Sequence, residues 1–210
     1  MTALAGLSIF ERGWLSSNNV LIHDPAGAVL VDSGHCLHGE QTAGLVQHAL
    51  ARTGETLAAV LNTHLHSDHC GGNAALARTF PGVPVFVPAS TWEAVQAWDE
   101  ERLTYAPTGQ RMERFVAAGT IHHGERLRLG GRDWEVLGAP GHDPDSIVLF
   151  DHTHGVLVSA DALWENGFGV VFPELEGIDA FDDVGRVLDL IERLPVSWVI
   201  PGHGAPFQDV

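Results

Sequence analysis

The chain has 210 residues, 45% of them hydrophobic, which is enough for one compact domain with a full core, and we expect one domain over residues 1–210. Its formal net charge is −16, and it contains eleven arginines and no lysine. This acidic balance excludes nucleic acid and anionic membrane surfaces as expected partners, because both bind clustered positive charge. No run of ~20 apolar residues could cross a bilayer, and the first residues lack the pattern of a signal peptide. We therefore expect a cytoplasmic protein with a small-molecule substrate, and a homodimer is left open.

Short apolar runs bounded by turn residues predict strands, and segments with helical spacing lie between them. The predicted strands are 19–23, 28–32, 58–62, 83–87, 134–137, 147–150, 155–159 and 198–200. The predicted helices are 38–52, 73–79, 90–98 and 178–194. This order predicts an α/β fold with two mixed β-sheets and helices packed outside them.

A segment around residues 90–116 differs from the rest, because aromatic residues alternate there with charged ones. One interpretation is a helical cover over the core. The other is a lid-like insertion that brings aromatic contacts, Tyr105 among them, to a substrate. The two interpretations are compatible.

The strongest motif follows the predicted strand 58–62 and reads Thr63-His64-Leu65-His66-Ser67-Asp68-His69-Cys70-Gly71-Gly72. Four side chains of metal-binding type occur here within six residues. They cannot all point at one metal from a regular strand, but in a loop they can surround two. Imidazole and carboxylate are ligands that Zn²⁺ accepts, so the motif predicts a metal site.

Three more residues of the same kinds lie just after predicted strands. They are His142 in a Pro-Gly-His-Asp sequence, Asp161 in Ser-Ala-Asp and His203 in Pro-Gly-His-Gly. Irregular backbone beyond a strand end can direct each side chain toward a shared cleft. A single histidine near a turn would be weak evidence, whereas the set in this order is specific.

With Asp32 in a Val-Asp-Ser-Gly sequence, these motifs resemble the metallo-β-lactamase superfamily, whose motifs run Asp, HxHxDH, His, Asp, His. The resemblance extends over residues 9–207 and implies a four-layer αββα sandwich with the site at one edge of the two sheets. It implies a first metal ion held by His64, His66 and His142. A second ion would be held by Asp68, His69 and His203, with Asp161 bridging both. Asp32 is expected to lie beneath the metal loop as a support and not as a ligand.

Two divalent ions, zinc first and iron or manganese as alternatives, would leave a coordination position for water. Bound water of this kind has its pKa lowered from about 15.7 to about 7. The resulting hydroxide would attack the carbonyl of an ester, thioester or lactone, and a metal would stabilise the developing oxyanion. Asp68 is the expected catalytic residue, because its carboxylate can orient that hydroxide.

Within the superfamily, Asp161 favours the glyoxalase II-like and lactonase-like branches, since the best-known β-lactamases carry Cys at the corresponding position. β-Lactam hydrolysis is therefore not expected. Glyoxalase II enzymes have a basic C-terminal helical extension, whereas few residues follow His203 here, so this feature argues against glutathione recognition. A compact, single-domain glyoxalase II-like enzyme acting on a hydroxyacyl-glutathione-like thioester is left open. Lactonases carry Tyr three residues after the bridging Asp, where this chain has Trp164.

The apolar run after Asp161 predicts part of the substrate pocket, with Trp164 and Phe168 as candidates beside Tyr105. Packing of these side chains in the core is the competing interpretation. Two other functions remain as alternatives: a mononuclear iron sulfur dioxygenase that oxidises a persulfide, and a non-catalytic ligand-binding protein. The complete second ligand set argues against both.

Overall fold

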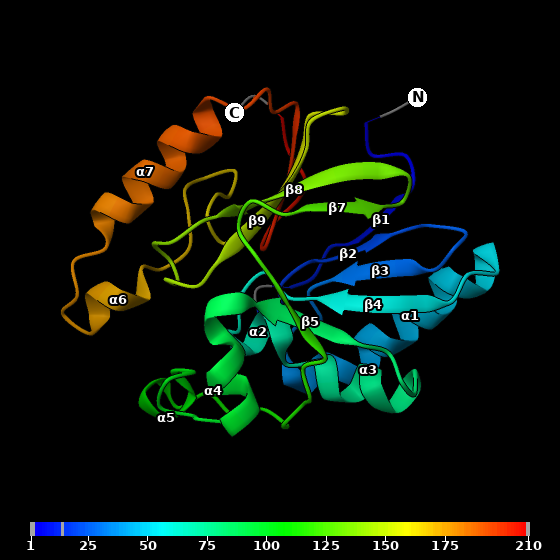
Figure 1. The fold of residues 1–210 in the computed structure, drawn as a ribbon, viewed down its shortest axis with the longest axis horizontal. Helices are drawn as coiled ribbons and strands as arrows, with labels where there is room; N and C mark the ends of the chain where they lie inside the picture. Colours follow the sequence, from blue (N-terminus) through cyan, green and yellow to red (C-terminus); the bar gives the residue numbers. More distant parts are fainter. Residues whose placement is uncertain (1–2, 14, 209–210) are drawn as a thin grey trace.

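The computed structural model describes residues 3–13 and 15–208 and arranges their strands in two sheets (Figure 1). Residues 1, 2, 14, 209 and 210 of the predicted domain lie outside the described residues. The first sheet has the order β1-β2-β3-β4-β5-β6, antiparallel from β1 to β3 and parallel from β3 to β6. Its strands are β1 (Leu7–Phe10), β2 (Asn19–Ile22), β3 (Ala28–Val31), β4 (Leu57–Leu61), β5 (Val85–Pro88) and β6 (Gly119–Ile121).

The second sheet has the order β11-β10-β9-β8-β7 and is antiparallel except for β11, which runs parallel to β10. Its strands are β7 (Arg126–Leu129), β8 (Arg132–Gly138), β9 (Ile147–Asp151), β10 (Val156–Ala160) and β11 (Trp198–Pro201). The two sheets lie one above the other in Figure 1, with the ends of several strands meeting near α2.

Helices cover the outer faces of both sheets (Figure 1). The α-helices are α1 (Gly39–Thr53), α2 (Ser67–Cys70), α3 (Asn73–Thr79), α4 (Trp92–Ala97), α5 (Tyr105–Thr108), α6 (Phe172–Leu175) and α7 (Phe181–Glu192). Two short 3₁₀ helices are η1 (Cys36–His38) and η2 (Ala89–Thr91). None of the helices in the described part of the chain combines the length and apolarity that crossing a membrane requires.

The burial pattern of β2 shows how the layers arise. Side chains alternate between the two faces of a strand, and all four residues of β2 are buried. Val20 and Ile22 pack between the sheets with Trp134 of β8, whereas Leu21 packs with Val46 of α1. A third core lies between the second sheet and α7. The result is the predicted four-layer αββα sandwich, which the structure confirms.

The sequence patterns missed three strands, all at the margins of the sheets. β1 and β7 are edge strands, and β6 has three residues. In β7 the exposed Arg126 and Arg128 alternate with half-buried leucines, a pattern that suits an edge open to water. The helix predicted from residue 178 begins at Phe181, so that Ile178 and Asp179 belong to the loop between α6 and α7.

The segment predicted as a lid-like insertion at 90–116 contains the end of η2 and the short helices α4 and α5. Leu103, Tyr105 and Phe115 are buried in the core that also holds α1. Thr104, Thr108 and Gln110 line cavities beside the predicted metal site. The segment therefore covers the core with some of its residues and borders the site with others.

Candidate metal centre

Asp32 supports the loop that follows β4. Its backbone has φ +57°, a left-handed conformation that Asp tolerates better than most residues, and its side chain is buried. One carboxylate oxygen accepts a hydrogen bond from Thr63 N at 2.8 Å, and the other accepts one from Thr63 Oγ1 at 2.8 Å. The second oxygen also accepts a hydrogen bond from His69 Nδ1 at 2.7 Å. This contact holds the proton of Nδ1 against Asp32, so Nε2 is the His69 nitrogen that faces the second cluster and would bind a cation.

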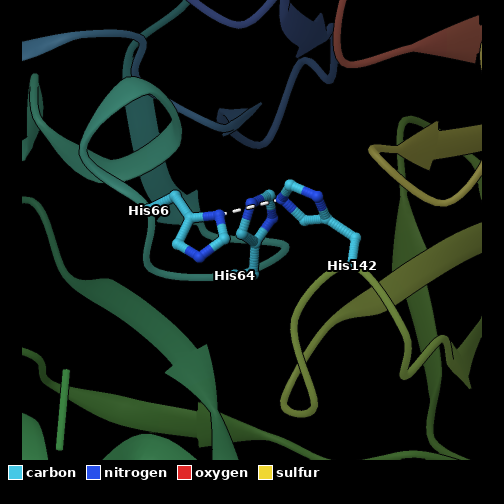
Figure 2. Close-up of side chains that lie close together, drawn as sticks. All are labelled: His64, His66 and His142. Atoms are coloured by element: carbon cyan, nitrogen blue, oxygen red, sulfur yellow. Dashed lines mark hydrogen bonds between the residues drawn. The ribbon is translucent and has the colours of Figure 1, made fainter. Parts of the chain in front are cut away.

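The first cluster consists of His64, His66 and His142, whose candidate ligand atoms lie within 4.8 Å of one another (Figure 2). His66 Nδ1 and His142 Nε2 are 2.8 Å apart and share a hydrogen bond, so a cation bound there would replace that proton. All three rings are buried. Burial lowers the pKa of His66 and of His142 to about 4 and lowers the pKa of His64 well below its usual range. All three imidazoles are therefore uncharged at neutral pH, and each has one nitrogen lone pair to offer a cation.

The second cluster consists of Asp68, His69, Asp161 and His203. His203 Nε2 donates to Asp68 Oδ2 at 3.0 Å, and His69 Nε2 lies 3.3 Å from Asp161 Oδ1. Burial opposes ionisation of both carboxyl groups, but the neighbouring histidine charges outweigh it. They lower the pKa of Asp68 far below its usual range and the pKa of Asp161 to about 2. Both side chains are therefore anionic at neutral pH.

Asp161 joins the two clusters. Its Oδ2 lies 3.4 Å from His142 Nε2 of the first cluster and 3.7 Å from His203 Nε2 of the second. Trp164 Nε1 donates to Asp161 Oδ1 at 3.2 Å and helps to fix the carboxylate. Ala160, just before it, has φ +46°, a strained conformation for a residue with a Cβ. The unusual backbone conformation of Ala160 thus directs the Asp161 side chain toward the two clusters.

Divalent cations fit this arrangement. His64 Nε2 and His69 Nε2 are buried and have no hydrogen-bond partner among the described residues, which is costly unless something else satisfies them. The donor set is imidazole and carboxylate, as zinc, iron and manganese accept. The backbone at Gly202 lies so close to Asp161 that a Cβ on this residue would be 2.1 Å from Asp161 Oδ1. The backbone thus makes room for the ligands where a side chain would displace them.

The three candidate pocket residues occupy different places. Trp164 contacts the second cluster, with its ring 5.3 Å from the ring of His203. Phe168 is 39% exposed and borders a very small cavity beside His142 and Asp161. Tyr105 is 1% exposed, and its hydroxyl donates to Leu65 O at 2.7 Å behind the metal loop. The prediction that Tyr105 faces the substrate is therefore wrong, because the side chain points into the core.

Two side chains beside the first cluster were not among the predicted site residues. The ring of Phe172, at the start of α6, lies 4.5 Å from that of His66 and 5.4 Å from that of His142. Asp143 Oδ2 lies 3.4 Å from His66 Nε2, and burial raises the pKa of this carboxyl group to about 6. The sequence carried a signal for both, since Asp143 follows a ligand directly and Phe172 ends the apolar run after Asp161.

Two cavities meet at His66 and Phe172. The smaller, of about 190 Å³, extends along α6 and the start of α7 and is called the α6 cavity below. The larger, of about 390 Å³, is bordered by Asp68 and by the polar side chains of His35, Ser67, Thr108 and Gln110. A ligand lying across the metal clusters would have one end in each cavity.

Comparison with known proteins agrees with this geometry. Residues 12–203 match the family model described as the metallo-beta-lactamase superfamily. The chain belongs to this superfamily. The family predicted from the motifs at His64–His69, His142, Asp161 and His203 is therefore confirmed.

Several members of the metallo-beta-lactamase superfamily are similar to the chain. A hydroxyacylglutathione hydrolase of Stenotrophomonas maltophilia (strain R551-3) is 36% identical over 153 residues, which are 73% of this chain and 48% of that protein. The chain thus spans about half the length of this relative. The crystal structure of the B3 metallo-beta-lactamase BLEG-1 has a TM-score of 0.76 at 25% identity, covering 96% of this chain and 93% of that one. The crystal structure of TTHA1623 in a di-iron-bound form has a TM-score of 0.73 at 26% identity, covering 96% and 94%.

Proposed function

We propose that the protein is a metal-dependent hydrolase of thioesters or related esters and lactones, with two divalent ions at the two ligand clusters. The observation that carries the proposal is the pair of adjoining clusters, one of three neutral histidines and one containing two anionic carboxylates. Divalent ions held there would activate water at neutral pH and polarise a substrate carbonyl. The similarity to a hydroxyacylglutathione hydrolase, whose substrate is a thioester, supports the same bond type.

The residues around the clusters have separable roles in this proposal. Asp32 keeps His69 in one tautomer, and Trp164 holds one oxygen of Asp161 so that the other faces His142. Asp68 is only partly buried and borders the larger cavity, so its carboxylate can accept a hydrogen bond from water there and orient it. Its lowered pKa keeps it an acceptor at neutral pH. Asp68 is therefore the proposed catalytic residue.

Zinc is the first choice for both ions, because histidine dominates the ligand set. The bridging position of Asp161 suits iron and manganese as well, and a structure similar to this one was determined with two irons. The identity of the metal therefore belongs to the proposal and is decided by analysis of the protein.

Elemental analysis of the purified protein, together with a substrate panel, tests the function. We expect two equivalents of metal per chain and hydrolysis of thioesters, and the panel includes lactones and a β-lactam. His66→Ala removes a proposed ligand of the first cluster, so we expect metal content to fall and hydrolysis to fall by more than about 100-fold. Loss of a residue that only supports a ligand already lowers activity by up to about 100-fold. His48→Ala, an exposed histidine of α1, is the matched control and should change neither.

Other outcomes would contradict the proposal in different ways. One equivalent of iron with oxygen uptake on a persulfide and no ester cleavage would identify a dioxygenase. Two equivalents of metal without turnover of any ester, thioester or lactone would identify a ligand-binding protein on the same fold.

A further inference from the structure

The α6 cavity has apolar walls. Its lining includes Pro144, Phe172, Pro173, Ile178 and Ala180, which come from the loop after His142, from α6 and from the loop before α7. His66 forms the end of the cavity that adjoins the first metal cluster. The larger cavity on the other side of Phe172 has fewer apolar side chains in its lining, Leu15 and Phe172. The apolar end of a substrate therefore fits the α6 cavity better.

The charged groups of the α6 cavity all have one sign. Its lining contains Asp143, Glu176, Asp179 and Asp183, and it contains no arginine. Asp183 is paired with Arg186, and Asp143 contacts His66. Glu176 and Asp179 are exposed at the rim and have no ion-pair partner among the described residues. A concave surface with one sign of charge repels ligands of the same sign, so these two carboxylates oppose anions.

The volume of the cavity limits the group that it can hold. About 190 Å³ corresponds to roughly six water molecules at ~30 Å³ each, or a chain of about as many non-hydrogen atoms. A carboxylate at the end of such a chain would lose water without gaining a basic partner, which is strongly unfavourable. An uncharged alkyl chain gains from the same burial.

We propose that the α6 cavity is the acyl subsite of this hydrolase, that it takes a short uncharged apolar acyl group, and that Glu176 and Asp179 exclude acyl groups ending in a carboxylate. This inference rests on the proposed hydrolysis of thioesters. It assigns the remaining part of the substrate, the thiol side, to the larger cavity beside Asp68 and Gln110.

The test uses metal-loaded full-length protein and thioesters of one uncharged thiol, N-acetylcysteamine, so that only the acyl group varies. Butanoyl and succinyl thioesters have the same number of acyl carbons and differ by the terminal carboxylate. We expect kcat/KM for the butanoyl thioester to exceed that for the succinyl thioester by at least about 100-fold, because burying an unpaired carboxylate is costly. Equal values for the two would overturn the inference.

The double variant Glu176→Gln/Asp179→Asn tests the rim. We expect it to raise the ratio of kcat/KM for the succinyl thioester to kcat/KM for the butanoyl thioester by about tenfold at low salt, since rim charges act over a Debye length of ~10 Å at 0.1 M salt. The matched control Asp182→Asn/Glu192→Gln removes two exposed acids of α7 that do not line the cavity. An equal gain in the control variant, or no gain in the rim variant, would overturn the role of Glu176 and Asp179.

A binding measurement separates failure of the subsite from failure of the proposed function. If no thioester is cleaved, saturation-transfer NMR is recorded with butanamide and with succinamate. Transfer to butanamide alone, weakened by Ile178→Asp, supports the apolar subsite although the hydrolase proposal has failed. Equal transfer to both ligands, or to neither, overturns the subsite itself.

Discussion

At the scale of single residues, the metal centre depends on positions that carry no ligand. Gly202 packs against Asp161, and a Cβ there would also lie 3.0 Å from His69 Cε1. Gly169 has the same relation to the first cluster, since its Cβ would lie 2.5 Å from His142 Nδ1. These glycines are required because the backbone itself forms the wall behind the ligands.

Gly202→Ala should therefore disrupt the second cluster. The added methyl group must displace Asp161 or the backbone, so we expect metal content to fall from two equivalents to one and hydrolysis to be lost. Elemental analysis and circular dichroism of the same sample check that the metal is lost while the fold remains. Gly185→Ala, in open space on α7, is the control and should retain both ions while stabilising the helix by up to about 1 kcal/mol. Two equivalents in Gly202→Ala would contradict this account.

At the scale of elements, α5 and the chain after it support the metal loop from behind. Tyr105 donates to Leu65 O, and Gln110 Oε1 accepts a hydrogen bond from Ser67 N at 2.7 Å. The two contacts lie on either side of His66 in the chain. Cys70 Sγ also donates to Leu65 O, and burial raises the pKa of this thiol above its usual range, so it remains protonated. The segment thus acts on the site through the loop backbone.

Tyr105→Phe tests this supporting role. Removing the hydroxyl leaves Leu65 O with the weaker thiol donor, so we expect the free energy of unfolding to fall by about 1 kcal/mol, a typical value for one buried hydrogen bond. Urea unfolding measures the change. Glu101→Gln changes an exposed side chain of the same segment, just before α5, and should stay within about 0.5 kcal/mol of the parent. Unchanged stability with a large change in KM would instead place Tyr105 against the substrate.

At the scale of the whole molecule, a buried ion pair connects the N-terminal segment to the second sheet. Arg132 of β8 donates to Asp151 Oδ2 at 3.1 Å and also to the backbone carbonyls of Ala3 and Ala5. Asp151 accepts further hydrogen bonds from Thr153 N at 2.9 Å and His154 Nδ1 at 2.6 Å. Asp151 and Arg132 are both buried, so removing the charge of Asp151 would leave a buried guanidinium without its carboxylate partner.

Asp151→Asn should lower the free energy of unfolding by about 3 kcal/mol, the range for breaking a buried pair. Burial opposes ionisation of Asp151, but hydrogen bonds from His154, Thr153 and Arg132 outweigh it and lower its pKa. A lowered carboxyl pKa adds stability above the unfolded value of about 3.9, and this is lost as the pH falls through the lower native value. The parent should therefore lose stability below about pH 4 more steeply than the variant.

Chemical denaturation between pH 3 and pH 7 measures both effects. Asp133→Asn, which removes the carboxylate of an exposed pair with Arg128, is the control and should change stability by less than about 1 kcal/mol. If the difference in the free energy of unfolding between Asp151→Asn and the parent does not decrease at acid pH, the lowered pKa is not that of Asp151.

The sequence by itself determined the family and the layered fold, and it singled out the candidate ligands. Four ligand-type residues fall within one short loop, and the others lie just after buried strands, so local spacing reveals them before any packing is known. Strands such as β2 and β9 are buried throughout and therefore stand out as apolar runs. The edge strand β7 escaped because half of it faces water.

Only the tertiary structure decided what surrounds the metal ligands. Tyr105 turned out to support Leu65, forty positions earlier, and Phe172 to border the rings of His66 and His142. The α6 cavity, with its apolar lining and its carboxylates, brings together Asp143 and Asp179, which are thirty-six positions apart in the chain. Contacts between such distant residues follow from how the layers pack, and periodicity along the chain carries no information about them.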